Sequence, residues 1–166
     1  MTVTRKGDFI VIDVGNTSTG IARFTAGELT AVRHIKGGIL SEAAACCDAI
    51  KGAAYQNEHH QTAPEAVVIA SVVPGANRVW QRVVKRELNL PLLFVSNALP
   101  LEITIDYPEP ATIGADRLAA ACGALRRYGA PLVVADFGTA LTFDVLTADR
   151  RYVGGVIAPG LPLMTD

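Results

Sequence analysis

Two segments far apart in the chain show nearly the same order of residue types. In residues 9–19 and again in residues 132–142, four apolar residues lead into an aspartate, Asp13 or Asp136. A glycine follows two positions after each aspartate, and a threonine follows six positions after it. Matching offsets at two places predict an internally duplicated scaffold.

The repeated pattern is one that can bind phosphate. An apolar strand that ends at Asp-x-Gly places a carboxylate at the strand end, and the glycine lets the backbone turn closely around a ligand. Hydroxyl and backbone N–H groups after the glycine can then contact phosphate oxygens. For one copy alone, a hairpin turn at Asp-x-Gly is the simpler interpretation. Two copies favour the phosphate site.

Composition excludes several classes of protein. The 166 residues suit one domain, or one and a fraction, and 50% hydrophobic with 19% charged residues predicts a packed core. A net charge of −1 makes nucleic acid and anionic membranes unexpected partners. The apolar run at residues 67–73 is far shorter than a membrane span, and Asp13 interrupts the N-terminal apolar stretch before signal-peptide length. Three cysteines without C-x-x-C spacing indicate a reduced, cytoplasmic protein.

The first part of the chain predicts a strand meander followed by alternating helices and strands. A helix is expected from Ser41, its candidate N-cap, and Pro74 opens another. Trp80, on the second helix, is interpreted as core or subunit interface. This order predicts a mixed sheet whose parallel part is covered by helices. The expected strands are residues 9–14, 20–25, 28–35, 66–72 and 92–95.

A third helix is expected over residues 113–128, with Thr112 as its N-cap and Gly129 as its stop. Strands then repeat the opening meander. They are expected at residues 132–136, 141–146 and 152–157.

Four clusters of residues occur in a characteristic order. They are Asp13 to Thr17, then Tyr107 with Pro110 and Gly114 to Arg117, then Asp136 to Thr142, and finally Gly154 to Gly160. In this order the chain resembles the type III pantothenate kinases, which belong to the acetate kinase, sugar kinase, Hsp70 and actin superfamily. The resemblance covers nearly the whole chain. It implies an α/β, ribonuclease H-like (actin-like ATPase) fold, duplicated, with an incomplete second copy.

The resemblance also implies an activity. That family transfers the γ-phosphoryl group of ATP to the primary hydroxyl of pantothenate, the first step toward coenzyme A. The implied ATP contacts are Asp13, Val14, Gly15, Asn16, Thr17, Ser18, Thr19, Gly20 and Thr139. The implied pantothenate contacts are Tyr107, Gly114, Ala115, Asp116 and Arg117.

Asp116 matches the catalytic base of the family. Near the start of a helix, the helix dipole favours its ionised form, which can accept the proton of an alcohol. Arg117 can meet the pantothenate carboxylate through two parallel hydrogen bonds. A purely stabilising aspartate at a helix start is the alternative for Asp116, and the neighbouring Arg117 and upstream Tyr107 favour the catalytic role.

The resemblance implies two cations besides ATP. Asp136 matches a ligand of a monovalent cation, K⁺ or NH₄⁺, and Asp13 lies where the family holds Mg²⁺. The chain departs from the family at Gly20, where a basic residue is common, and at Leu141, where threonine is common. Gly154-Gly155 and Pro159-Gly160 are interpreted as close-approach turns near the nucleotide.

The resemblance leaves other assignments open. A homodimer is expected, and the chain divides into a first domain, residues 1–130, and the opening strands of a second, residues 131–166. A non-catalytic accessory regulator of transcription, an inactive kinase fragment, and a polyphosphatase or sugar kinase are the alternatives. Since a helical portion is expected after Gly160 and the given sequence stops at Asp166, the chain alone is expected to bind ATP poorly and to show little or no kinase activity.

Overall fold

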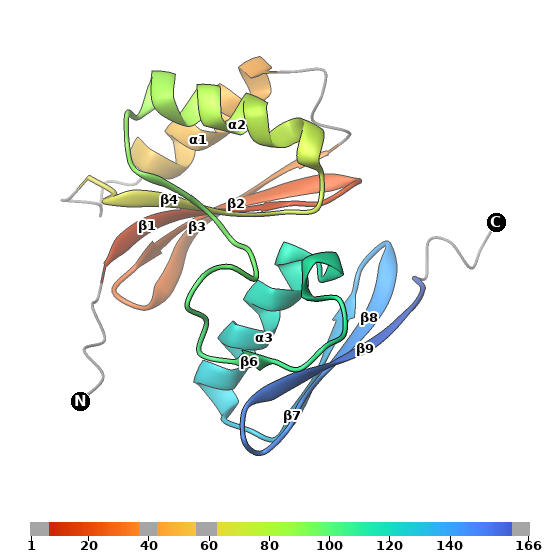
Figure 1. The fold of residues 1–166 in the computed structure, drawn as a ribbon. Helices are drawn as coiled ribbons and strands as arrows, with labels where there is room; N and C mark the ends of the chain where they lie inside the picture. The colour runs from red at the N-terminus through yellow and green to blue at the C-terminus, as the bar shows by residue number, and fades with distance from the viewer. Residues whose placement is uncertain (1–6, 37–42, 56–62, 161–166) are drawn as a thin grey trace. The chain divides into compact units, whose positions relative to one another are not determined.

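The computed structural model describes residues 7–36, 43–55 and 63–160, and they fall into two compact units, residues 1–94 and 95–166 (Figure 1). Each unit has its own sheet and its own hydrophobic core. The expected division of the chain after residue 130 into domains of the superfamily stays a prediction.

The first unit holds a five-stranded sheet with the order β3-β2-β1-β4-β5. It is mixed and has a parallel part, as the sequence predicted. Strand β1 pairs antiparallel with β2 and parallel with β4. Ala26 and Gly27 both have positive φ, 54° and 100°, as the tight turn from β2 to β3 requires. The strands are β1 (Asp8–Val14), β2 (Ser18–Thr25), β3 (Glu28–Lys36), β4 (Ala66–Ser71) and β5 (Leu92–Phe94).

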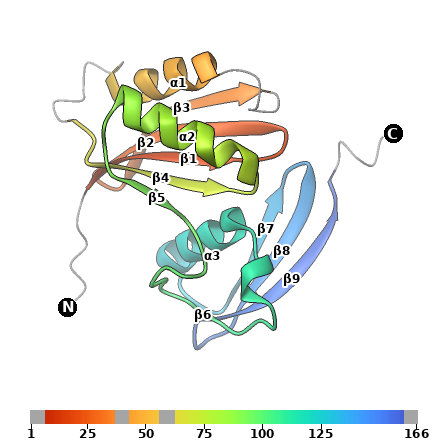
Figure 2. The same ribbon diagram turned by 45° about the horizontal axis from the view of Figure 1, so that its top comes forward.

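Two helices, α1 (Ala43–Tyr55) and α2 (Pro74–Glu87), cover one face of this sheet (Figure 2). Alternate residues of β1, namely Ile10, Ile12 and Val14, point to that face and are fully buried. Trp80 of α2 is completely buried in the same core, which confirms the core interpretation. The proposed N-cap Ser41 lies outside the described residues.

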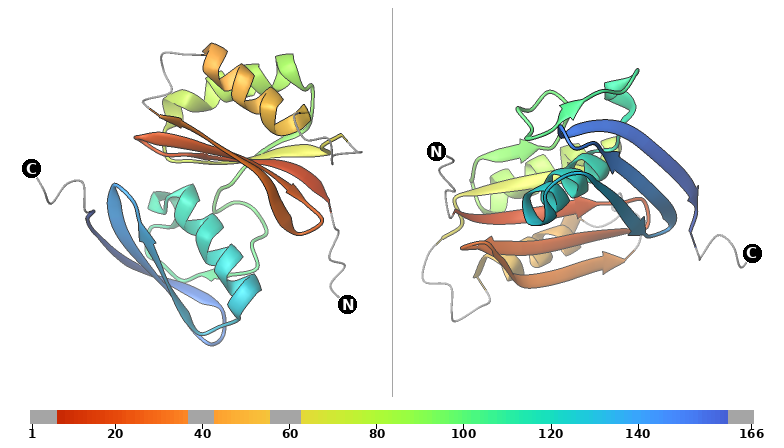
Figure 3. Two further views of the ribbon diagram at one scale, coloured as in Figure 1. Left: turned by 180° about the vertical axis from the view of Figure 1, so that it is seen from behind. Right: turned by 90° about the horizontal axis from the view of Figure 1, so that it is seen from below.

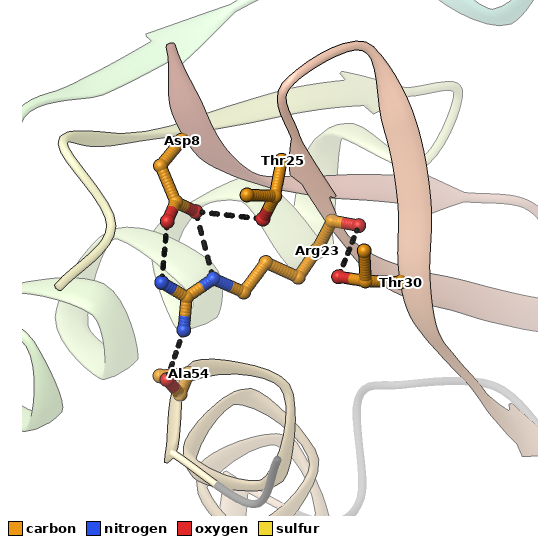
Figure 4. A network of polar contacts seen from close by, with 5 residues as sticks. All are labelled: Asp8, Arg23, Thr25, Thr30 and Ala54. Carbon is orange, nitrogen blue, oxygen red and sulfur yellow. Dashed lines mark hydrogen bonds and ion pairs between the residues drawn. The ribbon is translucent and has the colours of Figure 1, made fainter. Parts of the chain in front are cut away.

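A buried ion pair joins the first sheet to α1 (Figure 4). The guanidinium of Arg23 on β2 donates from Nε to Asp8 Oδ1 at 2.7 Å and from Nη2 to Asp8 Oδ2 at 2.5 Å. Its third nitrogen donates to the backbone oxygen of Ala54 near the end of α1, at 2.6 Å. Arg23 is 0% exposed, so each of these contacts replaces hydration that the charge has lost. No sequence pattern predicted this pair.

The second unit holds a four-stranded sheet with the order β6-β9-β8-β7, packed on one face by helix α3 (Figure 3). The short strand β6 runs parallel to β9 and was not expected from the sequence. The other three strands form the predicted second meander. The elements are β6 (Thr104–Ile105), α3 (Ala115–Tyr128), β7 (Leu132–Phe137), β8 (Ala140–Leu146) and β9 (Arg151–Pro159).

The start of α3 differs from the sequence prediction. Thr112 was expected to be the N-cap, but Gly114 occupies that position. Thr112 belongs instead to a preceding 3₁₀ helix, Pro110–Thr112, where its hydroxyl donates to the backbone oxygen of Glu109 at 2.7 Å. A threonine that hydrogen-bonds backward in this way is no longer available to cap the next helix. The predicted stop at Gly129 is confirmed, with φ of +80°.

Helix α3 covers one face of the second sheet, whereas apolar side chains on the other face are exposed. Leu132, Leu146 and Tyr152 face α3 and form its core with Leu118 and Leu125. On the opposite face, Val133, Phe137 and Val156 are 61%, 73% and 62% exposed in the described structure. Ile10 and Val14 hold the same places relative to Asp13 as Val133 and Phe137 hold relative to Asp136.

The cysteines are free thiols. Cys46 and Cys47 are buried on α1, as predicted, whereas Cys122 on α3 is half-buried. Burial raises the pKa of the Cys46 and Cys122 thiols, so both stay protonated near neutral pH. In the part of the chain that the structure describes, no helix has the length and apolar character needed to cross a membrane.

Candidate active site

The predicted phosphate-binding segment is a tight turn between β1 and β2. The N–H of Gly15 donates to the backbone oxygen of Ser18 at 3.0 Å, and Asn16, Thr17 and Ser18 are exposed. A Cβ on Gly15 would lie 3.1 Å from the oxygen of Ser18, so glycine suits the closeness of this turn. The turn therefore presents an amide and two hydroxyls to solvent.

Asp13 lies on the exposed position of β1, just before this turn. It is directly opposite Gly20 on β2 and Ala70 on β4. Gly20 in turn faces His34 on β3, whose ring would lie 3.7 Å from a Cβ at position 20. Oxygen donors such as the Asp13 carboxylate and the neighbouring hydroxyls suit a hard cation such as Mg²⁺.

The two repeated threonines are not equivalent in the structure. Thr19 is paired with Val14, whereas Thr142 is paired with Asp136, because the second hairpin has one residue fewer between its strands. Paired residues share a face of the sheet, so Thr142 lies on the face of the aspartate and Thr19 does not. Thr19 is fully buried, and its hydroxyl has no hydrogen-bond partner among the described residues.

The second Asp-x-Gly turn joins β7 to β8. Asp136 is exposed at the end of β7, and the N–H of Gly138 donates to the backbone oxygen of Ala140 at 3.0 Å. The end of β9 packs on this turn, where the N–H of Gly160 donates to the oxygen of Thr139 at 3.0 Å. A Cβ on Gly160 would lie 2.2 Å from the oxygen of Gly138, so only glycine fits.

The structure corrects the interpretation of Gly154-Gly155 as a turn. Both glycines lie inside β9, at an irregularity in its pairing with β8. Gly155 is pressed against the backbone of Phe143, and Gly154 has φ of +97°. A pair of glycines inside a strand is typical of a bulge or a close approach, and the same residues mark turns, so the sequence alone did not separate the two.

The predicted catalytic base, Asp116, and the predicted pantothenate contact, Arg117, lie at the start of α3. Asp116 is in the first helical turn, half-buried, and its Oδ1 accepts the backbone N–H of Arg117 at 2.7 Å. The N-cap Gly114 accepts the N–H of Leu118 at 3.2 Å. The helix dipole favours negative charge at this end.

The side chain of Arg117 contacts Asp144, which in turn contacts Tyr152, and the sequence did not suggest either residue. Its Nε donates to Asp144 Oδ1 at 2.9 Å, and the hydroxyl of Tyr152 donates to the same oxygen. Asp144 and Tyr152 are 1% and 0% exposed. Burial, followed by the hydrogen bond to Asp144, raises the pKa of the Tyr152 hydroxyl. Burial lowers the pKa of Arg117, but the hydrogen bond and charge of Asp144 outweigh it and raise the pKa overall.

Tyr107 lies close to the same group of residues. Its ring is so near Gly154 that a Cβ there would lie 2.7 Å from a ring carbon. The predicted pantothenate contacts all lie in the second unit, as do Asp136 and Thr139. The turn after Asp13 lies in the first unit. No group of three His, Cys, Asp or Glu residues that could hold a metal ion occurs in residues 7–36, 43–55 or 63–160.

Solved structures share this fold. The type II variant of the Ppx/GppA phosphatase of Aquifex aeolicus has a TM-score of 0.58 and 14% identity, and the match covers 96% of this chain and 54% of that one. A putative Baf family transcriptional activator from Campylobacter jejuni has a TM-score of 0.53 and 16% identity, covering 92% of this chain and 55% of that one. At such identities the likeness shows the fold alone.

The mixed sheets with their helices define an α/β protein of the actin-like ATPase fold, as the sequence predicted. The family described as type III pantothenate kinase matches residues 9–166. A type III pantothenate kinase of Chlorobaculum parvum is 34% identical over 93% of this chain and 57% of its own length. One from Akkermansia muciniphila is 52% identical over 61% of this chain and 40% of its own length. The chain belongs to the type III pantothenate kinase family and spans little more than half of the C. parvum relative.

Proposed function

We propose that this protein phosphorylates pantothenate with ATP, forming 4'-phosphopantothenate in the biosynthesis of coenzyme A. The observation that carries the proposal is the pairing of Asp116 and Arg117 at the start of α3 in a chain of this family. A carboxylate that can accept a proton and a guanidinium that can bind an anion suit an acceptor that carries both a hydroxyl and a carboxylate.

Asp116 orients the primary hydroxyl of pantothenate and accepts its proton as the oxygen attacks phosphorus. Arg117 and Tyr107 bind the acceptor, with the guanidinium directed to the pantothenate carboxylate. Phosphoryl transfer has a loose transition state, so alignment of donor and acceptor contributes most of the rate. The main task of these residues is therefore to position the acceptor.

On the donor side, the turn from Gly15 to Ser18 and the hydroxyl of Thr139 contact the phosphates of ATP. Asp13 would hold Mg²⁺, and Asp136 would hold K⁺ or NH₄⁺; when bound, these cations would neutralise negative charge on the phosphates. The closeness of Gly15 to Ser18, and of Gly160 to Gly138, supports the proposal that both turns approach a ligand with their backbone. Replacing potassium with a bulky organic cation is expected to abolish turnover, and an unaltered rate would contradict the role of Asp136.

The function is tested with concentrated purified protein, ATP, Mg²⁺, K⁺ and pantothenate, with product measured by mass spectrometry. The matched control is Asp116→Asn, which exposes any contaminating kinase. Loss of a positioned base typically costs about 10²–10⁴ in rate. We expect 4'-phosphopantothenate from the parent protein, at a low rate, and none above background from the variant. Equal product from the two proteins would contradict the proposal.

We propose further that the protein acts in the cytoplasm as a homodimer. Exposed apolar side chains of the second sheet, Val133, Phe137 and Val156, support association, because monomers rarely expose such clusters. Light scattering coupled to size-exclusion chromatography tests this directly, and a monomer at micromolar concentration would contradict it.

A further inference from the structure

The strongest unexplained feature of the second unit is a buried carboxylate behind the predicted substrate ligand. Asp144, on β8, is 1% exposed, and none of the four sequence clusters assigns it a role. One of its oxygens, Oδ1, meets Arg117 of α3 and Tyr152 of β9. Three elements are thus tied together at one oxygen atom.

The contacts leave part of the Arg117 guanidinium unused. Nε donates to Asp144 Oδ1 at 2.9 Å. Nη2 lies 2.6 Å from the same oxygen in an ion-pair contact, so both nitrogens of this edge face Asp144. Nη1 makes no hydrogen bond or ion pair within the described ranges of the chain. This nitrogen can therefore donate to a ligand.

The side chain has little freedom to move. It is 15% exposed, and one edge of its planar fork contacts Asp144, which itself accepts a hydrogen bond from Tyr152. A guanidinium fixed through one edge presents its other N–H groups in a defined direction, which suits the planar geometry of a carboxylate. Without Asp144 the same cation would sample several rotamers and lose part of its binding energy on ordering.

Tyr152 completes the arrangement. It is 0% exposed, and its hydroxyl supplies Asp144 Oδ1 with a neutral donor that is protonated throughout the physiological range. The second donor keeps the carboxylate from turning away from Arg117. Two residues further along β9, Gly154 lies against the ring of Tyr107, so the same strand supports both predicted acceptor contacts.

We propose that Asp144 and Tyr152 are positioning residues that hold the Arg117 guanidinium in the orientation that binds the carboxylate of the acceptor substrate. The inference rests on the proposed function, because it assumes that Arg117 meets a carboxylate. It assigns acceptor specificity to a buried pair on β8 and β9, which do not themselves contact the substrate.

The test compares pantothenate with its alcohol analogue, in which a hydroxyl replaces the carboxylate. In the parent protein we expect a lower KM for pantothenate than for the alcohol. Asp144→Asn keeps the size of the side chain but removes its charge, and Tyr152→Phe removes one hydrogen bond. A hydrogen bond to a charged group corresponds to about 10–100-fold in binding. We therefore expect Asp144→Asn to raise the pantothenate KM by about that factor, with the KM values for ATP and the alcohol unchanged.

A matched control separates positioning from general loss of an ion pair. Asp106 pairs with Arg151 at 2.8 Å on the exposed surface of the same unit, and Asp106→Asn should leave the ratio of the two KM values unchanged. Circular dichroism establishes that each variant is folded. If Asp144→Asn does not fold, Tyr152→Phe tests the proposal instead. We expect it to change the ratio of the two KM values in the same direction, by a smaller factor. A folded variant whose KM ratio equals that of the parent overturns the proposal.

A second readout does not depend on turnover. In protein labelled with ¹⁵N-arginine, the side-chain Nε–H signal of Arg117 should shift on addition of pantothenate and stay in place with the alcohol. If product forms but this signal does not respond to pantothenate, the positioning role is wrong and the kinase function stands. If pantothenate neither binds nor reacts, both proposals are overturned.

Discussion

The aromatic ring of Tyr107 lies directly against the backbone of Gly154, at a position where φ is +97° and where a Cβ would come within 2.7 Å of the ring. Both the backbone conformation and the contact favour glycine. Strand β9 thus limits where the side chain of Tyr107, a predicted pantothenate contact, can lie.

Gly154→Ala is therefore expected to displace Tyr107 and to weaken pantothenate binding. The matched control is Gly129→Ala, because Gly129 also has positive φ, +80°, but nothing lies within 4 Å of its would-be Cβ. Both variants should lose stability through backbone strain of about 1–2 kcal/mol. Calorimetric titration with pantothenate should show weaker binding for Gly154→Ala alone, and equal binding by both variants would contradict the expectation.

The buried pair Asp8–Arg23 predicts a large stability effect. Asp8→Asn leaves the fully buried guanidinium of Arg23 without its counter-charge, and breaking such a pair typically costs about 3–5 kcal/mol. Asp149→Asn removes an exposed partner of Arg151, 2.8 Å away, and should cost at most about 1 kcal/mol. Urea unfolding followed by circular dichroism measures both. The double variant Asp8→Leu with Arg23→Met should recover much of the loss, since no unpaired charge remains.

Glu87 predicts a pH-dependent contribution to stability. Hydrogen bonds from Lys51 and then Arg86 lower the pKa of its carboxyl to about 2. Because this pKa is lower in the folded protein, the stabilisation is fully present above about pH 4.5 and is lost as the pH falls toward 2. Urea unfolding of the parent and of Glu87→Gln should differ most near pH 6 and converge near pH 2. Lys51→Met in the Glu87→Gln background should add no further pH dependence, and a difference constant with pH would refute the assignment.

Gly160 predicts a local effect on the second turn. In Gly160→Ala the new Cβ would lie 2.2 Å from the oxygen of Gly138 and 2.6 Å from that of Thr139, and both are backbone atoms that cannot rotate away. We expect a lower melting temperature and exposure of the amide of Gly160 to hydrogen exchange. Gly123→Ala, in an exposed part of α3 with nothing within 4 Å, is the control and should instead stabilise the protein by about 0.5–1 kcal/mol. Equal melting temperatures would show that the turn adapts.

Periodicity and turn chemistry predicted most of the regular structure from the sequence. Strand β1 was recognised by its apolar run, and α2 by Pro74 at its start. The errors occurred where a local signal had two uses. Thr112 has the right chemistry for an N-cap, but its hydroxyl donates to the backbone oxygen of Glu109 instead. The two residues of β6 are too few to show the alternation of a strand.

The site was predicted only as far as its motifs extended. Asp116 and Arg117 are adjacent in sequence and could be recognised together. Asp144 meets Arg117, and Tyr152 meets Asp144, only through folding. Arg23 likewise lies in a run of apolar strand residues, where an arginine reads as exposed. Partners separated by 15 to 31 positions leave no pattern in a single sequence.

The one-residue difference between the two Asp-x-Gly hairpins has a consequence for engineering this scaffold. Aligning the halves residue by residue puts Thr19 and Thr142 in one column, yet the pairing requires a gap between the strands of the second hairpin. In a chimera that carried the loop of one hairpin between the strands of the other, the pairing would shift by one residue. Every side chain of the following strand would then point to the opposite face of the sheet. The hairpins are therefore interchangeable only as whole units, each transplanted with its own pair of strands.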